Sequence, residues 1–139
     1  MKVILSGPLG GQLDTGLQSS ALVIIKFFAK KLNIHRLHTK IEVRFHHRLS
    51  VDNSHSEGLC ESLGSRNFII DVALYGNWMS TPAHELVHVK QFARKELTEN
   101  LQYWKGNDHS DTDYWDQPWE KEARRLQKKM MIEYMSEFE

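Results

Sequence analysis

The sequence predicts a small α+β domain that spans all 139 residues. Two observations carry this prediction: two segments have the pattern of strands, and three others repeat apolar residues at helical spacing. The chain is long enough to bury a core without cross-links, and its single cysteine, Cys60, has no partner for an internal disulfide. We therefore expect one compact unit in which a short antiparallel or mixed sheet supports the helices.

The expected elements of the first half follow one another in a simple order. A glycine-rich loop over residues 8–16 leads into an N-terminal helix over residues 17–32. Residues 40–48 alternate apolar and polar side chains, which predicts a strand. Residues 49–66 are polar and turn-rich, so we expect a loop with one short strand there. Residues 68–74 are largely apolar and predict a second, buried strand.

The strongest functional signal is a pair of histidines four residues apart, His84 and His88. At this spacing the two imidazoles lie on one face of a helix and can bind one metal ion. Glu85 stands between them, and in hydrolases with this arrangement the glutamate takes a proton from a metal-bound water. Just upstream, Thr81 can cap the first turn of a helix and Pro82 fits its first position. The pattern predicts a zinc site with its own general base.

The surroundings of the motif favour this interpretation over chance, although the chain is rich in histidine. From Ala83 onward the apolar residues fall mostly on one arc of a helix, and the two histidines lie beside each other at its margin. Lys90 interrupts the arc. The apolar residues of this arc are Leu86, Val87, Val89, Ala93 and Leu97.

A third metal ligand is required, because a catalytic zinc usually has three protein ligands and one water. The metzincin extension of the motif is absent, since Gln91 and Arg94 stand where it needs glycine and histidine. A second helix that begins near Pro118 offers two carboxylates. Glu122 lies about 60° from the middle of its apolar stripe and Glu120 about 90° away on the other side. Glu122 is therefore expected nearer the buried face.

With these residues the chain resembles the gluzincin group of zinc metallopeptidases, in a minimal form that covers about residues 68–135. It is also similar to small phage-encoded proteins that carry the HExxH motif. The resemblance implies a zincin-like fold with an active-site helix and a C-terminal ligand helix, and Zn²⁺ as cofactor. It assigns His84, His88 and Glu122 as metal ligands and Glu85 as the base. The best-known members have asparagine before the ligand glutamate, where this chain has Lys121, so Glu120 stays the second choice.

His109 is a rival third ligand in the polar loop of residues 106–111. SprT-like domains, which are DNA-associated proteases, use a histidine as third ligand, but the chain lacks their usual glycine directly after it. A histidine in such a loop can equally be a solvated surface residue. A further role is open to His109, Tyr103 or Tyr114, which could donate a hydrogen bond to the oxyanion that forms when water attacks a carbonyl.

The predicted function is zinc-dependent hydrolysis of peptide bonds, with a peptide or protein as substrate. The alternative is a zinc-stabilised module that binds a protein without cleaving it. The charge is balanced, with 18 basic and 18 acidic residues, and gives no nucleic-acid signal. No apolar stretch is long enough for a secretory signal or a membrane span, so we expect a cytoplasmic protein. The family resemblance also implies that the strand over residues 68–74 forms the rim of the cleft and can pair with an extended peptide.

Overall fold

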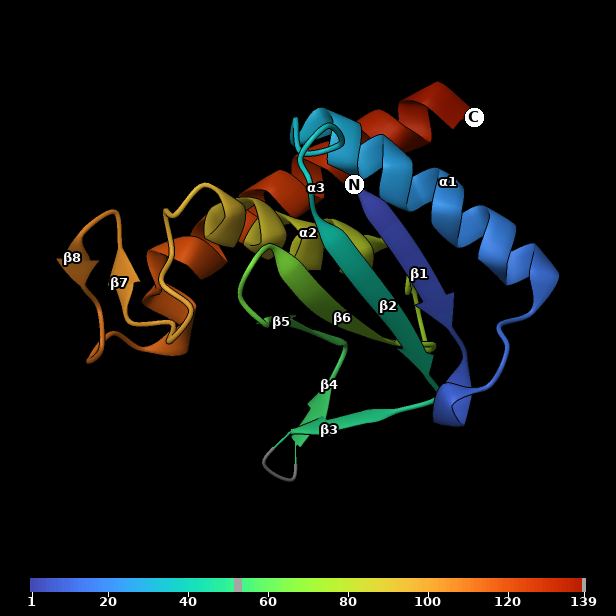
Figure 1. Cartoon of the computed structure of the whole chain (residues 1–139), viewed down its shortest axis with the longest axis horizontal. Coiled ribbons are helices and arrows are strands. Elements are labelled where there is room, and N and C mark those ends of the chain that lie inside the picture. Colours follow the sequence, from blue (N-terminus) through green and yellow to red (C-terminus); the bar gives the residue numbers. More distant parts are fainter. Residues whose placement is uncertain (52–53, 139) are drawn as a thin grey trace.

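The computed structural model of the protein describes residues 1–51 and 54–138. Figure 1 shows how its helices and strands are arranged. The predicted α+β class is confirmed. In chain order the elements are β1 (Lys2–Ser6), the 3₁₀ turn η1 (Pro8–Gly10), α1 (Thr15–Lys31), β2 (Lys40–His46), β3 (Leu49–Val51), β4 (Ser54–Ser56), β5 (Gly58–Ser62), β6 (Asn67–Ala73), α2 (Ser80–Ala93), β7 (Tyr103–Trp104), β8 (Asn107–Asp108), the 3₁₀ turn η2 (Tyr114–Asp116) and α3 (Pro118–Phe138).

The main sheet is mixed and has the strand order β1-β2-β6-β5. β1, β2 and β6 run parallel, and β5 pairs with β6 in the antiparallel direction at one edge. A parallel neighbour requires a crossover connection, and α1 supplies it between β1 and β2. The central strands alternate buried and less buried residues, as the period of a strand requires. Their buried side chains are Ile41, Val43, Phe45, Phe68, Ile70 and Val72, with Ala73 at the end of β6.

All three helices lie on one side of this sheet, whereas the β3–β4 hairpin projects away from it (Figure 1). The core fills the space between the helices and the sheet, where α1 contributes Ile24, Ile25 and Phe28, each fully buried. The opposite side of the sheet carries polar pairs, including His46 with Asp71 at 2.7 Å. No helix in residues 1–51 and 54–138 is long and apolar enough to cross a membrane.

Three sequence-based expectations need correction. Residues 49–66 form three strands in their described part instead of one, and residues 52–53 lie outside the description. The five-residue strand β1 was not predicted at all. The strand over residues 68–74 is β6, and it cannot pair with a peptide because β2 and β5 occupy its two edges.

The start of α2 also differs from the expectation. The helix begins at Ser80 with Met79 in the capping position, and no side chain caps it. Thr81 lies inside the first turn and is 5% exposed, so its side chain packs instead of capping. At the start of the helix, the Ser80 hydroxyl donates a hydrogen bond to the carbonyl oxygen of Asn77. The predicted helix is thus present, but it starts earlier than its capping signals indicated.

Candidate metal centre

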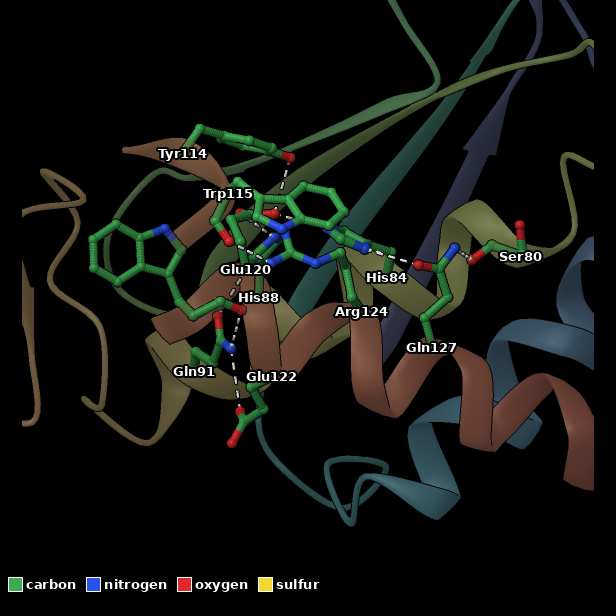
Figure 2. A network of polar contacts seen from close by, with 11 residues as sticks. Ser80, His84, His88, Gln91, Tyr114, Trp115, Glu120, Glu122, Arg124 and Gln127 are labelled. Carbon is green, nitrogen blue, oxygen red and sulfur yellow. Dashed lines mark hydrogen bonds and ion pairs between the residues drawn. The ribbon is translucent and has the colours of Figure 1, made fainter. Parts of the chain in front are cut away.

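Three potential metal ligands meet where α2 and α3 pack together. The Nε2 atom of His84 lies 3.0 Å from Oε1 of Glu120, and the Nε2 atom of His88 lies 3.0 Å from its Oε2. One ligand atom from each of the three residues lies within 4.8 Å of the others. The imidazoles stand edge to face, with ring centroids 5.1 Å apart. His84, His88 and Glu120 could therefore hold a metal ion, and Figure 2 shows the three side chains converging.

A glutamine fixes the other nitrogen of each imidazole. Nδ1 of His88 lies 2.8 Å from Oε1 of Gln91, and Nδ1 of His84 lies 3.0 Å from Oε1 of Gln127. The amide oxygen and nitrogen cannot be exchanged in either glutamine without the loss of a hydrogen bond to a backbone carbonyl. Nε2 of Gln91 donates to the carbonyl oxygen of Trp119, and Nε2 of Gln127 donates to that of Ser80. An amide oxygen only accepts, so both histidines carry hydrogen on Nδ1. Their Nε2 atoms are thereby directed toward Glu120, as metal coordination requires.

Without a metal, these groups form a buried ion cluster. Burial lowers the pKa of His88, but the hydrogen bond to Glu120 and the negative charges of Glu85 and Glu120 outweigh burial and raise it to about 9. The pKa of His84 is raised for related reasons. Burial raises the pKa of Glu120, but the hydrogen bonds from both histidines reverse this and lower it strongly. A divalent cation could replace the positive charge that the histidines supply here.

Two imidazole nitrogens with one carboxylate are a donor set that zinc accepts. Zinc bonds of about 2.0–2.1 Å to nitrogen and oxygen would place neighbouring donor atoms about 3.3 Å apart. The two pairs that involve Glu120 are 3.0 Å apart. Each pair uses a different oxygen of Glu120, and one ligand atom from each of the three residues lies within 4.8 Å of the others, which is close enough for one metal ion to bind all three after the side chains adjust.

Glu85 lies beside the three candidate ligands and is 6% exposed. It lines a pocket of about 170 Å³ together with His84, His88 and Glu120, and strand β5 forms another wall of this pocket. Burial raises the pKa of Glu85, which the positive charges of His88 and His84 counteract only in part. A carboxylate with a raised pKa next to a metal position is suited to accept and return a proton.

Gly58 on β5 allows the strand to approach the site closely. A Cβ atom at this position would overlap the methyl group of Thr81 and would lie 3.2 Å from Oε1 of Glu85. Only glycine lets the edge strand pack this tightly against the first turns of α2. Cys60, two residues further along β5, also lines the pocket, and burial raises the pKa of its thiol well above the ordinary value. The thiol is therefore kept neutral, which fits a wall of the pocket better than a nucleophile.

Tyr114 reaches the centre from the turn η2. Its hydroxyl donates a hydrogen bond to Oε1 of Glu120 at 3.0 Å, and it lines the pocket that contains Glu85. Burial and the negative charge of Glu120 raise the pKa of Tyr114 to about 12. The phenol thus stays protonated over the physiological range and can act as a hydrogen-bond donor. Of the three oxyanion candidates in the sequence, Tyr114 is the one that the structure brings to the metal ligands.

The predicted third ligand, Glu122, is directed away from the histidines. Its Oε1 accepts hydrogen bonds from Lys90 at 2.7 Å and from Gln91 at 3.1 Å. Lys90 is only 8% exposed and needs a nearby anion, which Glu122 and Glu96 provide. We therefore correct the candidate ligand set to His84, His88 and Glu120. The angle from the apolar stripe was misleading, because residues on both sides of the stripe of α3 contact α2. The two histidines lie on the side that carries Glu120.

His109 and Tyr103 do not join the three ligands. Nδ1 of His109 lies 3.1 Å from the Thr112 hydroxyl, and its ring packs edge to face on Trp119 at 6.0 Å. Tyr103 lies in the β7–β8 hairpin and is 40% exposed. The SprT-like alternative, with His109 as third ligand, thus has no support from these contacts.

One sequence signal could have identified the correct carboxylate. Glu120, Arg124 and Gln127 follow one another at helical spacing on α3, and all three face α2 or η2 (Figure 2). A polar row of this kind beside an apolar stripe indicates a helix flank that borders a polar site. The comparisons with known proteins add no family assignment: no protein-family model, curated protein or solved structure matches the chain.

Proposed function

We propose that the protein is a zinc-dependent metallopeptidase, with His84, His88 and Glu120 as zinc ligands and Glu85 as general base. The observation that carries the proposal is the convergence of three ligand atoms within 4.8 Å beside a buried glutamate in one pocket. Three protein ligands leave a coordination position for water, as in catalytic zinc sites. The HExxH spacing of His84 and His88 supports the same assignment.

Zinc, when bound, would act as a Lewis acid and bring the pKa of a coordinated water toward neutrality. Residues of the chain would transfer the proton and stabilise the developing charge. Glu85 takes a proton from the water as its oxygen adds to the peptide carbonyl carbon. The Tyr114 hydroxyl, whose single hydrogen would turn from Glu120 to the substrate, donates a hydrogen bond to the carbonyl oxygen as negative charge develops on it. When the bond between carbon and nitrogen breaks, Glu85 returns the proton to the departing amine.

A matched pair of variants tests the ligand set. Glu120→Gln removes a carboxylate ligand, whereas Glu122→Gln makes the same chemical change two residues away and can still accept a hydrogen bond from Gln91. Zinc content would be measured by elemental mass spectrometry on protein purified without chelator. We expect about one zinc per chain in the wild type and in Glu122→Gln, and a loss of zinc in Glu120→Gln. Loss of zinc in Glu122→Gln alone would contradict the corrected set.

Catalysis is tested by Glu85→Gln, which removes the base and leaves the three ligands in place. With a mixture of fluorescence-quenched peptides as substrate, the wild type should hydrolyse some members, and the variant should keep its zinc but lose at least about 10²-fold in rate. Equal hydrolysis by both proteins would refute the role of Glu85. Full zinc content with no hydrolysis of any peptide by the wild type would favour the zinc-stabilised binding module instead.

A further inference from the structure

Arg124 on α3 lies beside the candidate metal centre, one turn after Glu120. It lines a second, more polar pocket of about 320 Å³ on the His84 side of the centre. This pocket shares His84, Glu85 and Tyr114 with the first, so the two pockets lie next to each other at the candidate metal centre. The charged residues on its walls are Glu57, Glu85 and Arg124.

The guanidinium group of Arg124 is held in place by Trp115. It lies over the indole ring, 3.9 Å from the ring centroid, and donates a hydrogen bond to the carbonyl oxygen of Trp115. Stacking and this hydrogen bond fix the plane of the guanidinium, which reduces the entropy lost when it binds a further group. Figure 2 shows Arg124 extending from α3 toward the same region as Tyr114 and Glu120.

No described carboxylate neutralises this arginine. Within residues 1–51 and 54–138, no acidic oxygen lies within ion-pair distance of its guanidinium, although Glu57 and Glu85 line the same pocket. A guanidinium has five N–H donors in a planar fork, and one hydrogen bond to Trp115 leaves donors for an incoming anion. Partial burial would strengthen such a contact relative to one on an open surface.

The chemistry favours a carboxylate as the partner of Arg124. A carboxylate carries a single negative charge and matches the guanidinium fork with two parallel hydrogen bonds. A phosphate dianion would bring a second negative charge into a pocket that already contains the carboxylates of Glu57 and Glu85. The position beside His84 and Glu85 places that carboxylate near the bond under attack.

We propose that Arg124 selects peptide substrates that carry a carboxylate next to the scissile bond, either a free C-terminus or an acidic side chain. This inference rests on the proposed function, because it assumes a peptide bound at the metal centre. Arg124 would then be a specificity-determining residue that contacts substrate, and Trp115 would position it.

Binding of metal-directed probes can test this without a known substrate. The probes carry one hydroxamate group, which anchors on zinc, joined through a malonyl unit to four different ends. Glycine with a free carboxylate is paired with glycine amide, and aspartate amide is paired with asparagine amide. Dissociation constants would be measured by calorimetry on the zinc-loaded full chain. The first pair reports on a free C-terminus and the second on an acidic side chain.

We expect at least one acidic probe to bind roughly tenfold more tightly than its neutral partner. Arg124→Gln should abolish this preference while the neutral probes bind as before. Arg125→Gln is the matched control, because Arg125 is the exposed neighbour of Arg124 and should leave the preference unchanged. If the glutamine variant does not fold, Arg124→Lys should fold and show a reduced preference, since a single ammonium replaces the planar fork.

The outcomes separate this inference from the proposed function. Hydroxamates that bind the wild type with equal affinity for acidic and neutral ends would overturn the role of Arg124 and leave the zinc site intact. A preference for carboxylate that persists in Arg124→Gln would also overturn it. Failure of every hydroxamate to bind, together with absence of zinc, would refute the metal centre itself, and the inference would fall with it.

Discussion

Gln91 connects His88 to Glu122 across the interface between α2 and α3. Its Oε1 lies 2.8 Å from Nδ1 of His88, while its Nε2 donates to Oε1 of Glu122 at 3.1 Å. The side chain is fully buried, so water cannot readily replace either hydrogen bond, and the loss of one would cost free energy. Glu122, although it is not placed as a candidate ligand, thus helps to orient the candidate ligand His88 through one intervening residue.

Replacing Gln91 by leucine should weaken zinc binding. Leucine keeps most of the volume but removes the acceptor that orients His88, and the loss of such a group typically lowers metal affinity by about 10–100-fold. The dissociation constant would be measured by competition with a chromophoric chelator. Gln12→Leu, at an exposed position in the segment before α1, is the control and should bind zinc like the wild type. Unchanged affinity in Gln91→Leu would mean that His88 needs no such support.

Replacing Glu122 by alanine should destabilise the fold. Lys90 would keep only Glu96, 2.9 Å away, as a partner in a place where its side chain is 11% exposed. A buried cation that loses one of two anions should cost about 1–3 kcal/mol of unfolding free energy, measured by urea titration of the zinc-loaded protein. The double variant Glu122→Ala, Lys90→Met removes the buried charge as well and should recover most of the loss. No recovery would indicate that the contact with Gln91, and not Lys90, carries the effect.

The sequence predicted the framework of the site more reliably than its third ligand. His84, Glu85 and His88 are local to one helix, and their relative placement follows from helical periodicity alone. The third ligand depends on how α3 packs against α2, which no spacing within α3 determines. The burial of Lys90 was the missing information: a lysine within an apolar arc requires an anion, and Glu122 supplies it.

The sheet shows the same division between local and non-local information. The alternation in β2 and the apolar run of β6 predicted two strands correctly. The edge strand β5 was obscured because only its pairing with β6 and its contact with α2 define it. Its sequence, Gly58 to Ser62, has weak strand propensity, and glycine is disfavoured in strands. The tight packing against Thr81 and Glu85 explains why glycine is nevertheless needed there.

Replacing Gly58 by alanine should therefore destabilise the protein. The added methyl group would overlap that of Thr81 and crowd Glu85, and overpacking of this kind costs about 1–3 kcal/mol. Because the overlap is with the Thr81 methyl, the double variant Gly58→Ala, Thr81→Ser should regain part of the loss. Ser20→Ala, at an exposed position within α1, is the control and should be neutral or slightly stabilising. Thermal unfolding monitored by circular dichroism would compare the wild type, Gly58→Ala, Thr81→Ser, the double variant and the control. Additive effects of the two substitutions would contradict a direct overlap.

The metal-free protein should lose stability as the pH rises from about 6.5 to about 9. His88, which faces Glu85, Glu120 and His84, has a pKa of about 9 when folded, above its ordinary value of 6.5. A histidine whose pKa is raised on folding stabilises the folded state fully at pH values below its pKa in the unfolded chain. This stabilisation, here about 3 kcal/mol, is lost as the pH rises through the pKa in the folded state. The lowered pKa of Glu120 describes the same ion pairs and adds no separate contribution. Zinc affinity should increase over the same pH range, because protons compete with the metal for His88.

Urea unfolding of the metal-free protein in chelator, at several pH values, would measure the loss of stability. Glu120→Gln should flatten this pH dependence and the exposed His38→Gln should not. A stability of the chelated wild type that stays constant over this range would show that Glu120 does not hold the proton on His88.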